Sequence, residues 1–103
     1  MREREYQAKL IKKLRREFPG VIILKNDSEY LPGVPDLLVL YGNRWAMLEV
    51  KVAPDASTRP NQEYYVDLFN EMSFGAFIHP FNEKEVLDEL RRTFQGIQIP
   101  SSS

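Results

Sequence analysis

The chain has 103 residues, enough for one domain with its own core and too few for a targeting domain beside a catalytic one. The absence of cysteine excludes disulfides, thiolate zinc sites and cysteine nucleophiles, and no apolar stretch approaches the roughly 20 residues of a membrane span. A net charge of -1 does not by itself indicate a nucleic-acid ligand, and we expect a soluble, cytoplasmic protein without a membrane partner.

Residues 1–18 are predicted to form the first helix, because apolar residues recur there at spacings of three and four and Pro19-Gly20 follows. This segment holds seven Lys or Arg against three Glu, whereas residues 61–90 hold seven acids against Lys84 alone. Lys9 and Lys12 belong to the outer surface of the helix. They are candidates for contacts with phosphates, and an ordinary solvated helix face explains them equally well.

Residues 21–52 are predicted to form a meander of three antiparallel strands. Its first strand, residues 21–25, is β-branched and aliphatic, and we expect it to be buried beside the hairpin that follows. Lys25, at the end of this strand, points either toward a site or into solvent. The loop 26–34 leads into the hairpin, and Gly33 should allow close approach of backbone or substrate.

The hairpin is built around Gly42-Asn43, a dipeptide suited to a two-residue turn between two aliphatic runs. Counting outward from this turn places Asp36 directly opposite Glu49, and like charges in that position destabilise a sheet. Lys51 lies two residues beyond Glu49 and therefore on the same face. Charged groups in such apolar surroundings are tolerated when they are paired or bound to a metal.

A divalent cation held by oxygen ligands is the natural partner for two close carboxylates. The simpler alternative is a surface hairpin on which Glu49 and Lys51 are solvated charges. Apolar residues on both faces of the two strands favour a central, buried hairpin instead.

The second half of the chain continues with a polar loop before Pro60, in which Arg59 is a possible substrate contact. Residues 60–80 are predicted to form a helix and a fourth strand, parallel to the second strand of the hairpin. A last helix at 83–94 and a loose tail at 97–103 follow. We interpret His79 as a strand-end residue, because nothing near it in the sequence supplies a Ser or Cys nucleophile.

Pro35-Asp36, a spacer and then Glu49-Val50-Lys51 resemble the signature of the PD-(D/E)XK nuclease superfamily. The predicted order is helix, three antiparallel strands, helix, strand, helix. This α/β arrangement with a mixed four-stranded sheet is similar to the restriction-endonuclease-like core of that superfamily. The whole chain, 1–103, would then be a single nuclease domain.

Within the superfamily, the segment Glu5-Tyr6-Gln7 and the helix-start Gln62 resemble the small phage and virus-type replication–repair nucleases, the VRR-NUC branch. A branch similar to Holliday-junction resolvases is the other match. Gln62 is thus a possible substrate contact, and an exposed glutamine at a helix start is the simpler reading. Likewise, Glu5 could serve only to complement the helix dipole.

The resemblance implies Mg²⁺ as the cofactor, with Mn²⁺ as a substitute. The residues that it assigns to catalysis are Asp36, Glu49, Lys51 and Glu5, with Glu3 as the alternative first-helix acid. The metal ligands that it implies are Asp36, Glu49, Val50 and Glu5.

We therefore expect a metal-dependent DNA endonuclease that acts on branched or replication and repair DNA, in the cytoplasm of a host cell if the chain is viral. A homodimer is expected, because paired cuts are most simply made by two symmetric copies of a single-site domain. The alternative is a non-catalytic nucleic-acid-binding or assembly module of the same fold, in which the charged cluster is a buried ion-pair network.

Overall fold

The computed structural model describes residues 1–95, and the predicted tail at 97–103 lies outside them. Three helices and four strands follow one another in the predicted order. Their bounds are α1 (Glu3–Glu17), β1 (Ile22–Lys25), β2 (Leu37–Tyr41), β3 (Arg44–Val50), α2 (Pro60–Met72), β4 (Gly75–Ile78) and α3 (Glu83–Gln95). None of the helices in this part of the chain is long and apolar enough to cross a membrane.

The four strands form one mixed sheet in the order β1-β2-β3-β4. The first three are antiparallel neighbours, and β4 runs parallel to β3, as the sequence predicts. Gly42 has a φ of 62° at the hairpin turn, a backbone conformation that glycine adopts without strain. Tyr41 pairs with Arg44 across this turn, and the predicted register of the hairpin is confirmed.

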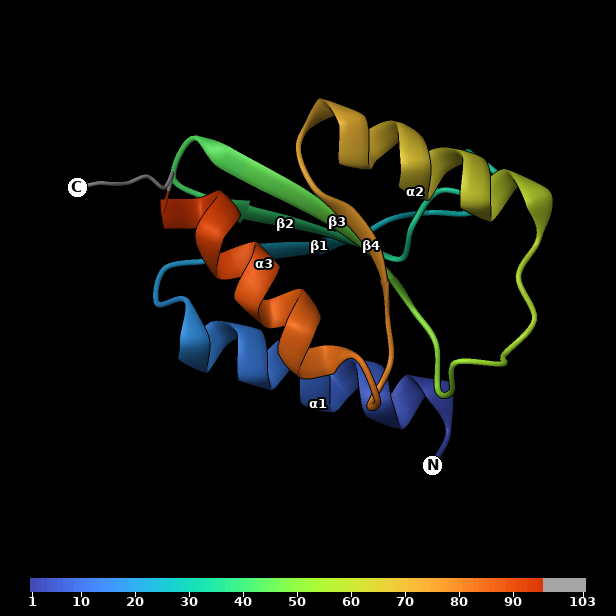
Figure 1. Cartoon of the computed structure of the whole chain (residues 1–103), viewed down its shortest axis with the longest axis horizontal. Helices are drawn as coiled ribbons and strands as arrows, with labels where there is room; N and C mark the ends of the chain where they lie inside the picture. Colours follow the sequence, from blue (N-terminus) through green and yellow to red (C-terminus); the bar gives the residue numbers. More distant parts are fainter. Residues whose placement is uncertain (96–103) are drawn as a thin grey trace.

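The core lies on one face of the sheet, beneath α1 and α3. Buried residues of both helices pack against alternate residues of β2 and β3, among them Leu37, Val39 and Leu48. On the opposite face, α2 packs against β3 and β4, where the ring of Phe69 meets that of Trp45. Figure 1 shows α2 on the side of the sheet away from α1.

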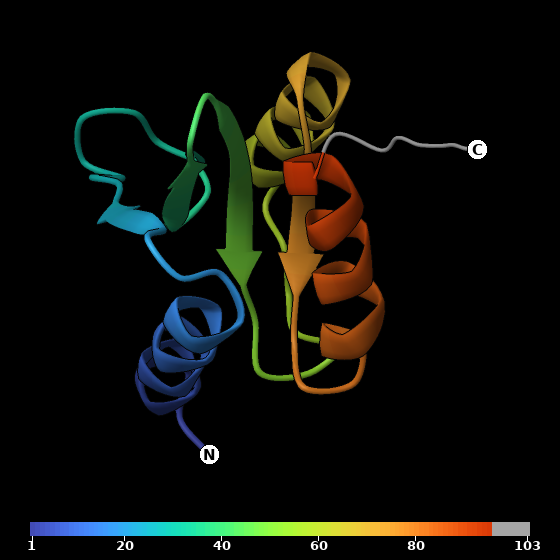
Figure 2. The same cartoon turned by 90° about the vertical axis from the view of Figure 1, so that its left-hand side faces the viewer.

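One expectation about the sheet is wrong. Residues 21–25 were expected to be a buried strand, but β1 is an edge strand, and the side chains of Ile22 and Leu24 are 56% and 47% exposed. Only the side of β1 that carries Ile23 packs against the core. The other side is open because α2 stands over β3 and β4 and does not reach β1, as Figure 2 shows.

Candidate active site

The two carboxylates predicted to face each other lie at the end of the hairpin. The register that pairs Leu37 with Leu48 brings Asp36 opposite Glu49, one step farther from the turn. The backbone N–H of Asp36 donates a hydrogen bond to Glu49 Oε1 at 3.1 Å, and the N–H of Val50 donates to Asp36 Oδ2 at 2.8 Å. Glu49 is only 3% exposed. The two acids are therefore fixed by backbone donors on opposite strands.

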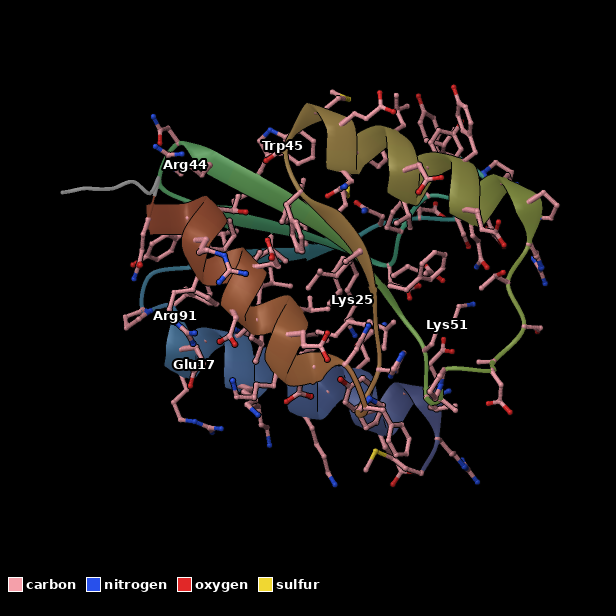
Figure 3. All side chains as sticks on the ribbon, in the orientation of Figure 1. Glu17, Lys25, Arg44, Trp45, Lys51 and Arg91 are labelled. Atoms are coloured by element: carbon pink, nitrogen blue, oxygen red, sulfur yellow. The ribbon has the colours of Figure 1, made fainter. Side chains whose placement is uncertain are left out.

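Lys51 and Gln62 complete a buried network around Glu49. The Lys51 ammonium lies 3.7 Å from Glu49 Oε2 and donates to Gln62 Oε1 at 3.2 Å and to the carbonyl of Ser57 at 3.1 Å. Gln62 Nε2 in turn donates to Glu49 Oε2 at 3.0 Å. This pattern of donors and acceptors fixes the orientation of the Gln62 amide. Figure 3 shows Lys51 just past the end of β3, beside the loop that leads to α2.

A cavity of about 210 Å³ opens onto these groups. Its walls come from the start of α1, the loop 26–34, the ends of β2 and β3, and the start of α2. The lining residues are Glu3, Ser28, Pro32, Gly33, Val34, Asp36, Glu49, Lys51, Arg59, Asn61 and Gln62. Four separate segments of the chain therefore converge on one concave, charged site.

The loop 26–34 is held against the start of α2 by a close contact at Gly33. This residue has a φ of 91°, and a Cβ added to it would lie 2.8 Å from Asn61 Cγ. Asn61 Nδ2 also donates to the carbonyl of Pro32 at 3.1 Å. The close approach expected at Gly33 is confirmed, and its partner is Asn61, to which no sequence motif pointed.

The structure brings Glu3, and not Glu5, to the cavity. Glu5 Oε1 accepts a hydrogen bond from the backbone N–H of Arg2 at 3.2 Å and so caps the start of α1. Glu3 lines the cavity beside Lys51, and its pKa is raised first by burial and then by the charge of Asp36. Glu3, the alternative first-helix acid, is therefore the one that the geometry favours, and Glu5 has the capping role that suits a helix start.

The other predicted contact residues are divided between two surfaces. Arg59 lines the cavity together with the acids. Lys9 and Lys12 lie instead along a separate groove of about 420 Å³ between α1 and the start of α3, which Lys13 and Arg16 also line. Lys25 is exposed at the end of β1 and does not line the cavity.

Burial raises the pKa values of all three acids at the site, and the charge of Asp36 raises those of Glu49 and Glu3 further. Burial of Glu49, and then the nearby charge of Asp36, raise the Glu49 pKa to about 7, although the positive charge of Lys51 lowers it. Burial likewise raises the pKa of Asp36, although the hydrogen bond from Val50 opposes the shift. Lys51 and Arg59 supply two positive charges against three carboxylates, so the lining of the cavity has an excess of acidic groups.

The donor set suits a hard divalent cation in part. Glu49 is buried and Asp36 half-buried, the two lie close together, and the Val50 N–H binds only one oxygen of Asp36, Oδ2. Within the same residues, however, no three acidic or histidine side chains converge closely enough to form a complete metal site. Two carboxylates therefore fit an ion directly, and Glu3 stands near them as a more distant third.

The raised pKa of Glu49 predicts how stability depends on pH in metal-free buffer. A carboxyl group that binds its proton more tightly when folded stabilises the fold at low pH, and this contribution is lost as the pH rises from about 4.5 to 7. The shift corresponds to about 3 kcal/mol for Glu49. Urea unfolding in EDTA across this range should show the loss, and Glu49→Gln should flatten it. A wild type that gains stability relative to Glu49→Gln over this range would contradict the prediction.

Comparison with known proteins identifies the fold. No family model matches the chain, and no curated protein sequence matches it. A solved structure titled "VRR_NUC domain protein" matches with a TM-score of 0.64 at 12% sequence identity, over 100% of this chain and 93% of that chain. At this identity the likeness concerns the fold alone. The chain has the α/β, restriction-endonuclease-like fold expected from its sequence, as found in a VRR_NUC domain protein.

Proposed function

We propose that this protein is a metal-dependent endonuclease that hydrolyses phosphodiester bonds in DNA, with a preference for branched or replication and repair structures. The observation that carries the proposal is the opposition of Asp36 and Glu49 at the floor of a cavity that also holds Lys51. The likeness in fold to a protein titled as a VRR_NUC domain supports a nuclease-like domain. Activity and substrate preference are our inference from the site.

Asp36 and Glu49 would hold Mg²⁺, for which Mn²⁺ should substitute, with Val50 and the more distant Glu3 as further ligands. A bound divalent ion supplies Lewis acidity, which activates water as a nucleophile and offsets charge on the phosphate. The network orients Glu49: the Asp36 N–H binds one of its oxygens and Gln62 binds the other. The chain thus fixes its carboxylates before substrate arrives.

Lys51 is proposed to stabilise the negative charge that develops on the phosphate during hydrolysis. Its ammonium cannot coordinate a cation, but it lines the cavity with the acids and lies 3.7 Å from Glu49. The bonds to Gln62 and the Ser57 carbonyl hold it in place. Arg59, on the cavity wall, and Lys9 and Lys12, in the groove between α1 and the start of α3, are proposed contacts to DNA phosphates.

We also propose that the protein acts as a homodimer in the cytoplasm, a host cytoplasm if it is viral. Two copies would allow paired cuts in opposite strands of a branched substrate.

A second reading has a specific observation in its favour. Both Glu49 oxygens and the Lys51 ammonium already have partners within the protein, as members of a structural ion-pair network would. Under that reading the chain is a nucleic-acid-binding or assembly module, and the cluster only stabilises the loop and the start of α2. Calorimetric titration with Mg²⁺ or Mn²⁺ separates the two readings, because only the nuclease requires an ion at Asp36 and Glu49.

The proposed activity predicts cleavage of at least one branched DNA substrate in Mg²⁺. Purified protein should be incubated with single-stranded, nicked, flapped and four-way DNA, and the products resolved on denaturing gels. EDTA should abolish cleavage, and Mn²⁺ should restore it. Intact DNA on every substrate, with either metal, would favour the binding module.

Asp36→Asn should remove activity while leaving thermal stability in metal-free buffer unchanged or higher. An asparagine keeps an oxygen for the Val50 N–H and removes the repulsion with Glu49. The matched control is Asp67→Asn on the exposed side of α2, which should keep full activity. If Asp36 belonged to a structural ion-pair network, its variant would instead lose about 3–5 kcal/mol of stability.

Lys51→Met should lower turnover by about 10²–10³-fold, the effect typical of losing one electrostatic contact to the transition state. Methionine retains the buried stem and removes only the ammonium, so metal affinity and DNA binding should change little. Lys12→Met on the exposed groove is the control, and it should weaken DNA binding and reduce its salt dependence. Normal turnover of Lys51→Met at saturating DNA would assign Lys51 to phosphate anchoring.

A further inference from the structure

On the sheet face that carries α2, no helix packs over β1 and β2 among residues 1–95, and apolar side chains continue from there onto β3. The register places Ile22, Leu40 and Trp45 in one row across β1, β2 and β3. Leu24, Leu38 and Met47 form the next row on the same face. All six side chains are apolar, and we refer to these two rows as the apolar face. An antiparallel sheet that meets water on one side normally carries polar residues there.

The helix α2 adds further apolar side chains beside this surface. It covers β3 and β4 and leaves β1 and β2 open, as Figure 2 shows. Phe69 packs edge-on against Trp45 with ring centroids 6.0 Å apart, and Tyr65 stacks on Phe69 at 5.9 Å. Figure 3 shows Trp45 between β3 and the C-terminal half of α2. The side of α2 that follows Tyr65 and Phe69 around the helix also carries Met72 and Tyr64, and together these four residues form the α2 flank.

Exposed apolar residues concentrate on these two features. Among residues 1–95, seven large hydrophobic residues are exposed. Four of them belong to the apolar face or the α2 flank, namely Ile22, Leu24, Tyr64 and Met72. Scattered single residues of this kind are normal, whereas a contiguous patch marks an interaction site.

We propose that the apolar face and the α2 flank form the interface with a second copy of this chain, so that α2 of each copy lies over β1 and β2 of the other. The two features are complementary. The α2 flank is an apolar helix surface without a partner in its own chain, and β1 and β2 offer an apolar sheet surface like the one against which α2 packs on β3 and β4. A two-fold axis makes both contacts at once and completes the helical layer on this face of both sheets.

Charge and size both favour a second copy over DNA. No side chain of the apolar face or of the α2 flank is charged, so neither offers the Lys or Arg contacts with which proteins bind phosphates. A helix of 13 residues is about 20 Å long, and two strands with a helix flank are roughly 15–20 Å wide. A two-fold axis forms this contact twice, and the total surface area buried then corresponds to the smaller class of specific interfaces.

The interface would border the candidate site. The row after Leu24 and Leu38 consists of Asn26, Asp36 and Glu49, since the N–H of Asn26 donates to the Asp36 carbonyl at 2.9 Å. Each copy would therefore stand next to the acids of the other. This inference does not depend on nuclease activity, and it is tested without metal or DNA.

Sedimentation equilibrium over a wide range of protein concentrations tests the proposal. Wild type should show a reversible dimer, and Ile22→Lys or Leu24→Lys should weaken it at least tenfold. Both side chains are half exposed in one copy, so each variant should fold, as circular dichroism can verify. Phe81→Lys is the matched control, because Phe81 is 75% exposed in the turn before α3 and outside the interface. It should leave the dimer unchanged.

Cross-linking gives a second measurement that does not rely on disrupting the dimer. Because the chain has no cysteine, a mixture of Ile22→Cys and Met72→Cys proteins can join only through the introduced thiols. A short bis-maleimide should link Ile22→Cys to Met72→Cys, and Phe81→Cys should link to neither. A wild type that stays monomeric, a dimer that tolerates both Ile22→Lys and Leu24→Lys, or a failure to cross-link Ile22→Cys to Met72→Cys would each overturn the proposal.

Discussion

The opposition of Asp36 and Glu49 across the hairpin is the constraint on which the rest of the site depends. Two carboxylates in a strand pair repel each other, and burial adds to the cost of their charges. The fold offsets this cost with directed donors: two backbone N–H groups, the Gln62 amide and the Lys51 ammonium. Gln62 belongs to the start of α2, and the Ser57 carbonyl that holds Lys51 belongs to the loop before it. The hydrogen bonds that fix the acids therefore also fix this loop and the start of α2 at the end of β3.

The two faces of the sheet have different roles. One face is filled by α1 and α3 and supplies most of the buried apolar contacts. The other carries the acids in one row and apolar side chains in the next two, with α2 over only half of it. Extended backbone alternates its side chains between faces, so Leu37, the first residue of β2, lies in the core and Asp36, directly before it, lies at the site.

Local pattern was sufficient to predict the hairpin. The Gly42-Asn43 turn sets the register, and the register sets which residues meet, so the placement of Asp36, Glu49 and Lys51 followed from counting. The exposure of β1 was not predictable in this way, because a β-branched run reads alike whether or not a helix covers it. The exposure of β1 depends on how many strands of the sheet α2 covers.

The choice between Glu3 and Glu5 also depended on tertiary structure. Both acids lie in the first turn of α1, and only the angle at which the helix meets the end of the sheet decides which one faces the cavity. The positions of Asn61 and Ser28 at the site could not be predicted from the sequence for a related reason. They line the site from segments whose sequences carry no motif, and their role appears only when the loop 26–34 lies against α2.

The hydrogen bond from Gln62 to Glu49 Oε2 sets up a competition at the site. Any cation that takes this oxygen must displace the amide, and a hydrogen bond to a charged group is worth about 1.5–3 kcal/mol. The oxygen of the same amide accepts hydrogen bonds from the Lys51 ammonium and from the backbone N–H of Arg59, so its release would loosen the hold on Lys51 and on the start of α2. The ion would then bind more weakly to the free protein than to the protein with substrate, where a phosphate replaces the lost contacts. A nuclease of the proposed kind would therefore hold its metal most tightly when substrate is present.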